Sequence, residues 1–407
     1  MSLPPAPAPI PSPAAEAPTW SAEQRLLALV ARVMRIEGVV WGGPHDAVRA
    51  RFVGRVLGDT AAAYDRLWAA LAPWDLTPLF RADPHGRHVV LLVQGRLRPQ
   101  PSRAWVNALL FVLTLLSVLW TGWVSFATGD PLTTAKQALA FTAALLLILV
   151  SHEFGHYFMA RHHGMAVSLP YFLPLPAPLS PFGTLGAFIR LKEPPRNRRV
   201  LLDVGLAGPI AGLVVALPLL WLGLRWSRLG PLPAPTPGQA LMLEGNSLLY
   251  LAAKYLVFGR WLPAPVGGWN GLDALRFVLT GRPVPWGGVD VILHPVALAA
   301  WVGLLVTALN LLPVGQLDGG HVLFALLGQR ARRLFPVIVA LTATLGVFWS
   351  GWWLWTFLIL LLGRRYAEPL DMLTTLDPTR RAWAWLGLLV WVLTFTPIPL
   401  QLFMAGP

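Results

Sequence analysis

Long apolar runs, separated by short polar segments, occupy most of the chain beyond residue 104. A helix needs about 20 apolar residues to cross a bilayer, and most of these runs approach or reach that length. They predict a polytopic α-helical membrane protein with about six or seven transmembrane helices. The fifth and sixth runs are short and are expected to form a tight hairpin. The expected spans are residues 105–127, 135–150, 201–224, 294–314, 335–346, 352–362 and 383–403.

The first hundred residues follow a different pattern. Residues 1–18 are rich in Pro and Ala and are expected to be disordered. Residues 19–98 mix helical and strand periodicities, which predicts a small soluble α/β domain ahead of a membrane domain at residues 104–403. Ser21 and Gln24 fit a capping box that opens a helix reaching about Ile36. The other elements expected here are a strand at 50–56, a helix from Asp59 or Thr60, and strands at 78–81 and 88–93.

Two segments between the apolar runs are harder to classify. Residues 170–181 are rich in Pro and carry no charge, which favours a re-entrant or interfacial loop. Residues 226–293 are mixed in character and lack convincing strands, so we expect them outside the bilayer or along its surface.

The composition supports a membrane protein. Charged residues make up 13% of the chain, about half the share in a soluble domain, and there are 20 Trp. The net charge of +13 does not indicate nucleic-acid binding, because the basic residues cluster between apolar runs. By the positive-inside rule these clusters predict a multi-pass protein of the cell membrane. Its N-terminal domain and the end of its second span are expected to face the cytoplasm.

One turn of the second apolar run carries candidate chemistry. His152 and His156 are four residues apart, so on a helix both imidazoles point to nearly the same side. Glu153 lies beside them, which matches the HExxH arrangement of two metal ligands and a general base. The chain has no Cys, so a third ligand must be another His, Asp or Glu.

The best candidate for that ligand lies at the end of the fourth expected span. Asp318 sits in a stretch broken by Pro313 and several glycines. It could also be a helix-capping residue, but the two histidines lack a third partner and both motifs fall at the same end of their spans. Nearby, His321 is expected either to support a metal ligand or to end a helix.

These residues resemble the site-2 protease family of intramembrane metalloproteases. The family pairs HExxH with an NxxPxxxLDG element, found here as Asn310, Pro313 and the run 317–319. Residues 182–188 resemble the family's Gly-containing segment, and the resemblance covers about residues 50–365. Residues 196–199 and 208–212 are most similar to the cyanobacterial and plastid-type branch. Many bacterial members carry a PDZ domain between the two motifs, but we see no room for one near the first motif and no convincing strands for one in 226–293.

The resemblance implies a zinc metalloendopeptidase in the lipid bilayer that cleaves membrane-anchored proteins in or near their transmembrane segments. One zinc ion would be bound by His152, His156 and Asp318, and Glu153 would take a proton from the attacking water. Asn310 would orient the substrate or stabilise an oxyanion, although it equally fits a helix–helix hydrogen bond.

A membrane helix must unwind before it is cut, because its carbonyl groups are already hydrogen-bonded. We therefore expect the segment containing Gly183 and Gly186 to pair with the unwound substrate as a strand edge. Two other functions remain open on the same residues: a membrane transporter and a non-proteolytic membrane chaperone. The sequence gives no indication of the oligomeric state.

Overall fold

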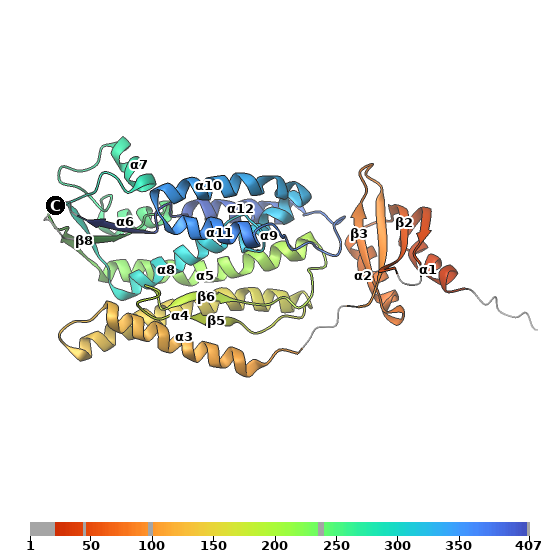
Figure 1. The fold of residues 1–407 in the computed structure, drawn as a ribbon, viewed down its shortest axis with the longest axis horizontal. Helices are drawn as coiled ribbons and strands as arrows, with labels where there is room; N and C mark the ends of the chain where they lie inside the picture. Colours follow the sequence, from red (N-terminus) through yellow and green to blue (C-terminus); the bar gives the residue numbers. More distant parts are fainter. Residues whose placement is uncertain (1–20, 44–45, 97–100, 235–239, 405–407) are drawn as a thin grey trace, which may run out of the picture. The chain divides into compact units, whose positions relative to one another are not determined.

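The computed structural model of the chain describes residues 21–43, 46–96, 101–234 and 240–404. The chain forms two units, Met1–Arg96 and Leu97–Pro407, which we call the N-terminal unit and the membrane unit (Figure 1). The tail expected to be disordered, residues 1–18, lies outside the described residues.

The N-terminal unit is an α/β fold with one four-stranded antiparallel sheet in the order β1-β2-β4-β3. Phe52, Tyr64 and Phe80 fill its core. The described elements are α1 (Ala22–Ala31), β1 (Met34–Trp41), β2 (Val48–Val56), α2 (Thr60–Ala70), the 3₁₀ helix η1 (Ala72–Trp74), β3 (Leu76–Ala82) and β4 (His88–Gln94).

The capping box at the start of this unit is confirmed. The Gln24 amide donates to Ser21 Oγ at 3.2 Å, and the Ser21 amide donates to Gln24 Oε1 at 2.8 Å. The expected extension of this helix to Ile36 is wrong, because α1 ends at Ala31 and a strand, β1, follows. Its pairing with β2 is a long-range contact that the local pattern did not reveal.

The membrane unit is a multi-span helical protein (Figure 1). Within the part of the chain that the structure describes, four segments are long and apolar enough to cross a bilayer: 104–125, 131–162, 198–226 and 318–348. Three shorter apolar helices accompany them, at 248–258, 295–310 and 351–362. The helices are α3 (Ala104–Ser125), α4 (Pro131–His162), α5 (Arg198–Trp226), α6 (Leu248–Phe258), α7 (Gly271–Thr280), α8 (Pro295–Asn310), α9 (Asp318–Leu327), η2 (Gly328–Leu334), α10 (Phe335–Phe348), α11 (Gly351–Leu362) and α12 (Pro378–Thr394).

Short strands in the described residues complete the membrane unit as three antiparallel pairs, β5–β6, β8–β10 and β7–β9. They are β5 (Tyr171–Pro174), β6 (Thr184–Phe188), β7 (Arg228–Pro231), β8 (Ala240–Glu244), β9 (Val289–Ile292) and β10 (Leu400–Met404). Within the described residues between the two sequence motifs, every sheet has two strands, so none is a PDZ domain.

Several expected boundaries are corrected by these elements. The segment 170–181 contains β5 rather than loop alone, and 226–293 contains three strands that sequence reasoning missed. The last expected span, 383–403, is divided: α12 ends at Thr394 and the chain returns as β10. Pro397 and Pro399 explain this end, because proline lacks the amide that a continuing helix needs. The expected hairpin is confirmed as the packed pair α10 and α11.

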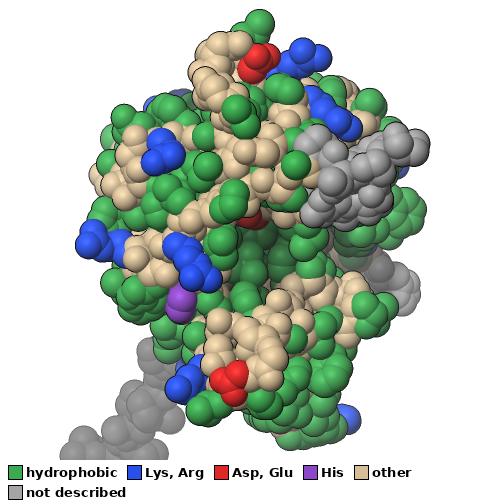
Figure 2. All heavy atoms as spheres, turned by 90° about the vertical axis from the view of Figure 1, so that its left-hand side faces the viewer, with side chains coloured by type: hydrophobic (Ala, Val, Ile, Leu, Met, Phe, Trp, Pro, Cys, Tyr) green, Lys and Arg blue, Asp and Glu red, His purple; other side chains and the backbone are tan. Residues whose placement is uncertain are grey.

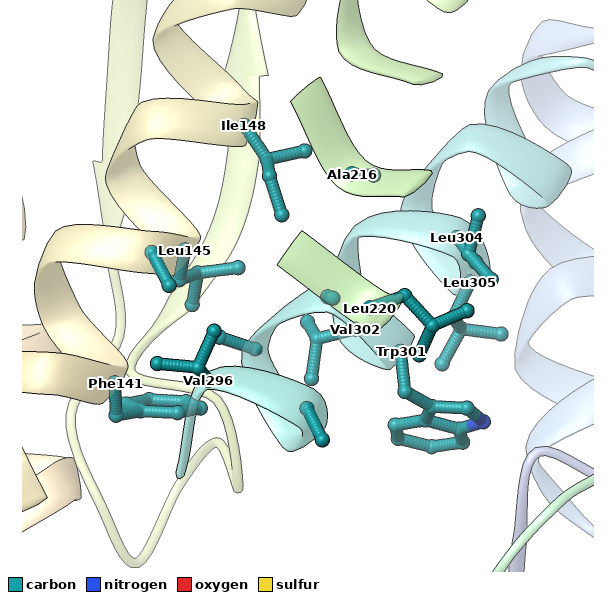
Figure 3. Close-up of a cluster of buried hydrophobic side chains, with 14 of the residues drawn as sticks. Phe141, Leu145, Ile148, Ala216, Leu220, Val296, Trp301, Val302, Leu304 and Leu305 are labelled. Carbon is teal, nitrogen blue, oxygen red and sulfur yellow. The ribbon is translucent and has the colours of Figure 1, made fainter. Parts of the chain in front are cut away.

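Helices α4, α5 and α8 form the core that positions the site. Figure 3 shows Phe141, Leu145 and Ile148 of α4 converging with Leu220 of α5 and Trp301 of α8. Small residues let the backbones approach. A Cβ added at Gly303 of α8, for example, would lie 2.8 Å from the Ile148 side chain. Substituting such residues would push apart the helices that carry the site.

The membrane unit has two ends, which are formed by different elements. We call the end where α3 begins, α4 finishes and α5 begins the site end. We call the other end, formed by α6, α7 and β7–β9, the far end. Figure 2 looks onto this end and shows hydrophobic side chains around a hollow, with basic side chains about its rim.

The far end contains a buried charge cluster formed by Glu244, Tyr250, Lys254 and Asp290. Lys254 is fully buried, and its Nζ lies 3.9 Å from Glu244 Oε1 and 3.7 Å from Asp290 Oδ1. The Tyr250 hydroxyl donates to Glu244 Oε1 at 2.9 Å. Two carboxylates therefore share one ammonium group in a dry environment.

Candidate metal centre

The last third of α4 carries the first half of the site. His152, Glu153 and His156 are all buried, with 3%, 4% and 5% of their surfaces exposed. His156 lies six positions before the end of α4 at His162, which is about 9 Å along a helix axis. The predicted placement of this motif near the end of an apolar helix is confirmed.

Helix α5 presents a smooth glycine face to both histidine rings. A Cβ added at Gly208 would lie 2.0 Å from His156 Nε2, and one added at Gly212 would lie 3.2 Å from His152 Nδ1. The Val204 carbonyl lies 2.7 Å from His156 Nδ1. This contact leaves the Nε2 atom of His156 as the one available for a metal.

Glycines also bring Asp318 to the site. Helix α8 ends at Asn310, and Asp318 begins α9 after a tight turn in which Gly315 has a φ of +59°. A Cβ added at Gly319 would lie 1.9 Å from the Leu311 carbonyl oxygen, so a side chain there would force the turn open. The turn places the Asp318 carboxylate against the two imidazoles of α4.

The three donor atoms form a nearly equilateral triangle. Asp318 Oδ2 lies 3.3 Å from His152 Nε2 and 3.2 Å from His156 Nε2, and the two Nε2 atoms are 3.2 Å apart. Ligands at about 2.0–2.1 Å from a tetrahedral zinc lie about 3.3–3.4 Å from one another. Two imidazoles and a carboxylate at this spacing fit zinc and leave its fourth position open.

Glu153 completes the arrangement. It lies on the same turn of α4 as His152 and His156, and it lines a cleft of about 160 Å³ with the three candidate ligands. Its Oε2 is buried and has no hydrogen-bond partner within the described residues. A carboxylate that lines the cleft in this way is available to exchange a proton with a bound reactant.

The supporting residues predicted from sequence separate into two groups. Asn310 and His321 both line the cleft, and Asn310 Nδ2 lies 3.4 Å from His152 Nε2. Gly183 instead packs on α3, where its carbonyl accepts a hydrogen bond from Ser117 Oγ at 2.6 Å. Gly183 and Gly186 do not line the cleft, and both have positive φ values that shape the β5–β6 hairpin.

The cleft has walls that sequence reasoning missed. Ala187, Phe188 and Ile189 line it from β6 and the residue after it, and Gln316 lines it from the turn before α9. Their proximity depends on the fold of the hairpin and the turn. The only sequence signal for the β6 wall was the neighbouring Gly-containing segment.

His162 and His163 lie outside the cleft. His163 Nε2 lies 3.0 Å from Asp203 Oδ2, and Arg380 also pairs with this carboxylate at 2.8 Å. These contacts tie the end of α4 to α5 and α12, which is a structural role.

Taken together, the fold and the site define a multi-span membrane protein with a zinc site of the HExxH type, formed by two apolar helices and a distant Asp. The family model for Peptidase family M50 matches residues 140–349, which include all three zinc ligands. The chain belongs to this family.

Curated relatives agree with the assignment. The chain is 27% identical over 338 residues to the probable zinc metalloprotease EGY2, chloroplastic, of Oryza sativa subsp. indica, covering 79% of this chain and 56% of that protein. It is 29% identical over 265 residues to the probable zinc metalloprotease EGY1, chloroplastic, of Arabidopsis thaliana, covering 64% and 43% respectively. The chain thus spans about half the length of the curated relatives it matches, and no solved structure matches it. The resemblance to the plastid-type branch is confirmed.

Proposed function

We propose that this protein is an intramembrane zinc metalloprotease that hydrolyses peptide bonds in or near the transmembrane segments of membrane-anchored proteins. One observation carries the proposal: His152, His156 and Asp318 present a tetrahedral face of donor atoms inside apolar helices, with Glu153 in the same cleft. Ionisable groups within a membrane are costly, so their presence there indicates function.

Zinc held by three protein ligands supplies Lewis acidity, which acidifies water and polarises a carbonyl group. The proton transfers fall to Glu153. Its carboxylate takes a proton from the water as that water attacks the peptide carbonyl carbon. It then gives the proton to the departing amide nitrogen as the C–N bond breaks, which yields a new carboxyl terminus and a new amino terminus.

Asn310 is positioned to assist the same step. Its side-chain amide lines the cleft and lies close to His152, so an N–H group is available to the oxygen that becomes negative during attack. We propose that Asn310 orients the substrate and stabilises this oxygen. Its location in the cleft supports this role, alongside its contact with His152 of the neighbouring helix α4.

The β6 edge is our candidate substrate-binding element. Strand β6 pairs only with β5 in the described residues, so its other edge is open, and Ala187 and Ile189 line the cleft. Arg190 accepts a backbone hydrogen bond from Ser168 on the β5 side. Because strand residues alternate, the amides of Ala187 and Ile189 should face the open edge. There they would pair with an unwound substrate, and Gly183 and Gly186 would shape the strand that presents them.

We further propose that the N-terminal unit and the metal centre face the cytoplasm. The segment joining α3 to α4 carries one charged residue, Asp130, whereas basic residues cluster around the site end, including Arg103, Arg198 and Arg199. The positive-inside rule favours this orientation.

Transport and non-catalytic chaperoning are the competing functions. Both would use the buried polar groups without needing a base beside the metal. The sequence shows no internal repeat of the kind that transporters carry. The carboxylate of Glu153, which lines the cleft beside the candidate ligands, favours the hydrolytic function.

The test is a comparison of purified wild type with Glu153→Ala, reconstituted with single-span membrane proteins carrying fluorescent tags. We expect the wild type to release tagged fragments and the variant to be slower by about 10²–10⁴-fold, because it lacks the base. Both should contain equal zinc by mass spectrometry. Equal cleavage by the two proteins would refute the proposed mechanism.

A further inference from the structure

A basic pocket lies at the site end, beside the first residues of α3. It has a volume of about 490 Å³, and none of the residues that line it is acidic. Three of its residues are basic and three carry hydroxyl groups. They are Arg103, Arg190, Lys192, Ser102, Ser168 and Tyr171.

The positive charges of this pocket are not neutralised by neighbouring groups. Among the described residues, neither Arg103 nor Arg190 nor Lys192 has a carboxylate within ion-pairing distance. Lys192 Nζ donates to Ser102 Oγ at 3.2 Å, which holds it at the pocket. The neighbouring acid, Glu193, instead accepts a hydrogen bond from the Ala166 amide at 2.7 Å.

The backbone at the start of α3 adds to the positive electrostatic potential of this pocket. Helix α3 has 22 residues, and no side chain caps its N-terminus at Arg103. Its first amide groups and the positive end of its dipole therefore lie beside the three basic side chains. Two guanidinium groups, an ammonium group and free amides are the donors that phosphate oxygens prefer.

The pocket lies where a bilayer would place phosphate. Helix α3 is one of the apolar segments long enough to span a membrane, so its first residue marks a boundary between hydrocarbon and water. Trp105, at this boundary, is 63% exposed, as befits an aromatic residue at the headgroup level.

We propose that this pocket binds a phosphate group, supplied by the headgroup of an anionic phospholipid. The pocket also has a connection to the metal centre, because Leu191 lines both the basic pocket and the cleft. A phosphate bound by Arg190 and Lys192 would therefore hold the segment that follows β6, next to the proposed substrate edge. Phosphate binding itself does not depend on the proposed protease function.

The experiment uses the purified full-length chain in detergent. Native mass spectrometry measures binding of phosphatidylglycerol and phosphatidylcholine to wild type and to the triple variant Arg103→Gln/Arg190→Gln/Lys192→Gln. The charge-matched control is Arg228→Gln/Arg260→Gln/Arg276→Gln, whose residues are exposed and lie at the far end. A separate arm measures thermal stabilisation of each protein by inorganic phosphate without lipid.

Each basic residue near a membrane surface contributes about fivefold to binding of an anionic lipid, so the pocket variant should bind phosphatidylglycerol about a hundredfold more weakly. The control variant should match wild type, and phosphatidylcholine binding should be equal in all three. A different outcome is that inorganic phosphate stabilises wild type but not the pocket variant, while phosphatidylglycerol binds both proteins equally. That result would overturn the lipid as the source and show that the pocket binds phosphate from solution.

The proposal is overturned if the pocket variant matches wild type in both the lipid and the phosphate arms. Zinc content and melting temperature report whether the triple variant is folded. If it is not, Arg190→Gln alone serves as the test, since this side chain is exposed. A single substitution should weaken phosphatidylglycerol binding about fivefold, and no change would equally overturn the proposal.

Discussion

The Nε2 atom of His156 lies 3.2 Å from the Oδ2 atom of Asp318, although one residue belongs to α4 and the other to α9. Both helices pack against α5, which therefore sets the distance between them. The metal centre is thus a product of helix packing. It should respond to changes in α5 as well as to changes in its own ligands.

Loss of a zinc ligand should empty the site. Asp318→Asn replaces a charged oxygen donor with a neutral one, and His156→Ala removes a donor. Wild type should contain about one zinc ion per chain. We expect each purified variant to contain far less. His162→Ala is the control, because His162 is outside the cleft and should keep full zinc. Full zinc in both ligand variants would show that the metal centre is misassigned.

A methyl group added to α5 should have a similar effect, although no ligand residue is replaced. In Gly208→Ala the added Cβ would lie 2.0 Å from His156 Nε2, so the ring or the helix must move. We expect a strong loss of zinc in that variant. Gly212→Ala is the graded comparison: its Cβ would lie 3.2 Å from His152 Nδ1, and most zinc should remain. Equal zinc in both variants would argue against close packing of α5 on the ligands.

A change at the open edge of β6 should lower the rate of substrate cleavage and leave the zinc content unchanged. Ala187→Pro removes an amide that we place on that edge, and so it should slow cleavage while zinc content stays normal. Ala187→Val keeps the amide at the same position and serves as the control. Unchanged cleavage in the proline variant would rule out backbone pairing at this residue.

The buried charge cluster should make stability depend on pH. Burial, and secondarily the charge of Asp290, raise the pKa of Glu244 from 4.5 to about 7. The folded protein therefore binds more protons than the unfolded chain between these values, and its free energy of unfolding should fall as pH rises from about 4.5 to 7. The fall should be about 1–3 kcal/mol.

Thermal unfolding in detergent over this pH range measures the effect, with Glu244→Gln as the control. The amide does not titrate, so its melting temperature should lose this part of the pH dependence. The same slope in both proteins would assign the pH dependence to other groups. In the fold, Glu244 faces Tyr250 and Lys254 of α6 and Asp290 of β9.

The proposed orientation can be tested by labelling, because the natural chain has no Cys. Single cysteines at His85, in the N-terminal unit, and at Gly129, between α3 and α4, are both exposed. In intact cells a membrane-impermeant maleimide should label Gly129→Cys and leave His85→Cys unlabelled until the cells are opened. The reverse pattern would invert the topology.

Sequence patterns predicted the parts of this protein that depend on local order. The apolar runs gave the long helices α3, α4 and α5, and the capping box gave the start of α1. The spacing of His152 and His156 identified two ligands, because four residues on a helix fix their relative positions. The sequence predicted Asp318 as the third ligand because two histidines alone do not complete a zinc site and because Asp318 lies in the NxxPxxxLDG element.

Features that depend on the pairing of one strand with another were missed. Strand β1 is stabilised by β2, and β10 by β8, so neither segment shows a clear pattern alone. The cleft wall formed by Phe188 and Ile189 depends in the same way on the β5–β6 hairpin. The number of full spans was also hard to predict from composition. The apolar run at 294–314 was expected to cross the bilayer, but its helix α8 has only 16 residues before the turn to Asp318.

The carbonyl of Val204 has a consequence for how this site tolerates mutation. The group that orients His156 is part of the main chain, so no exchange of one side chain for another can delete it. Random substitution at position 204 should alter packing yet leave the imidazole correctly turned. The glycines of the same helix differ in this respect, because a Cβ at Gly208 or Gly212 would press directly on a histidine ring.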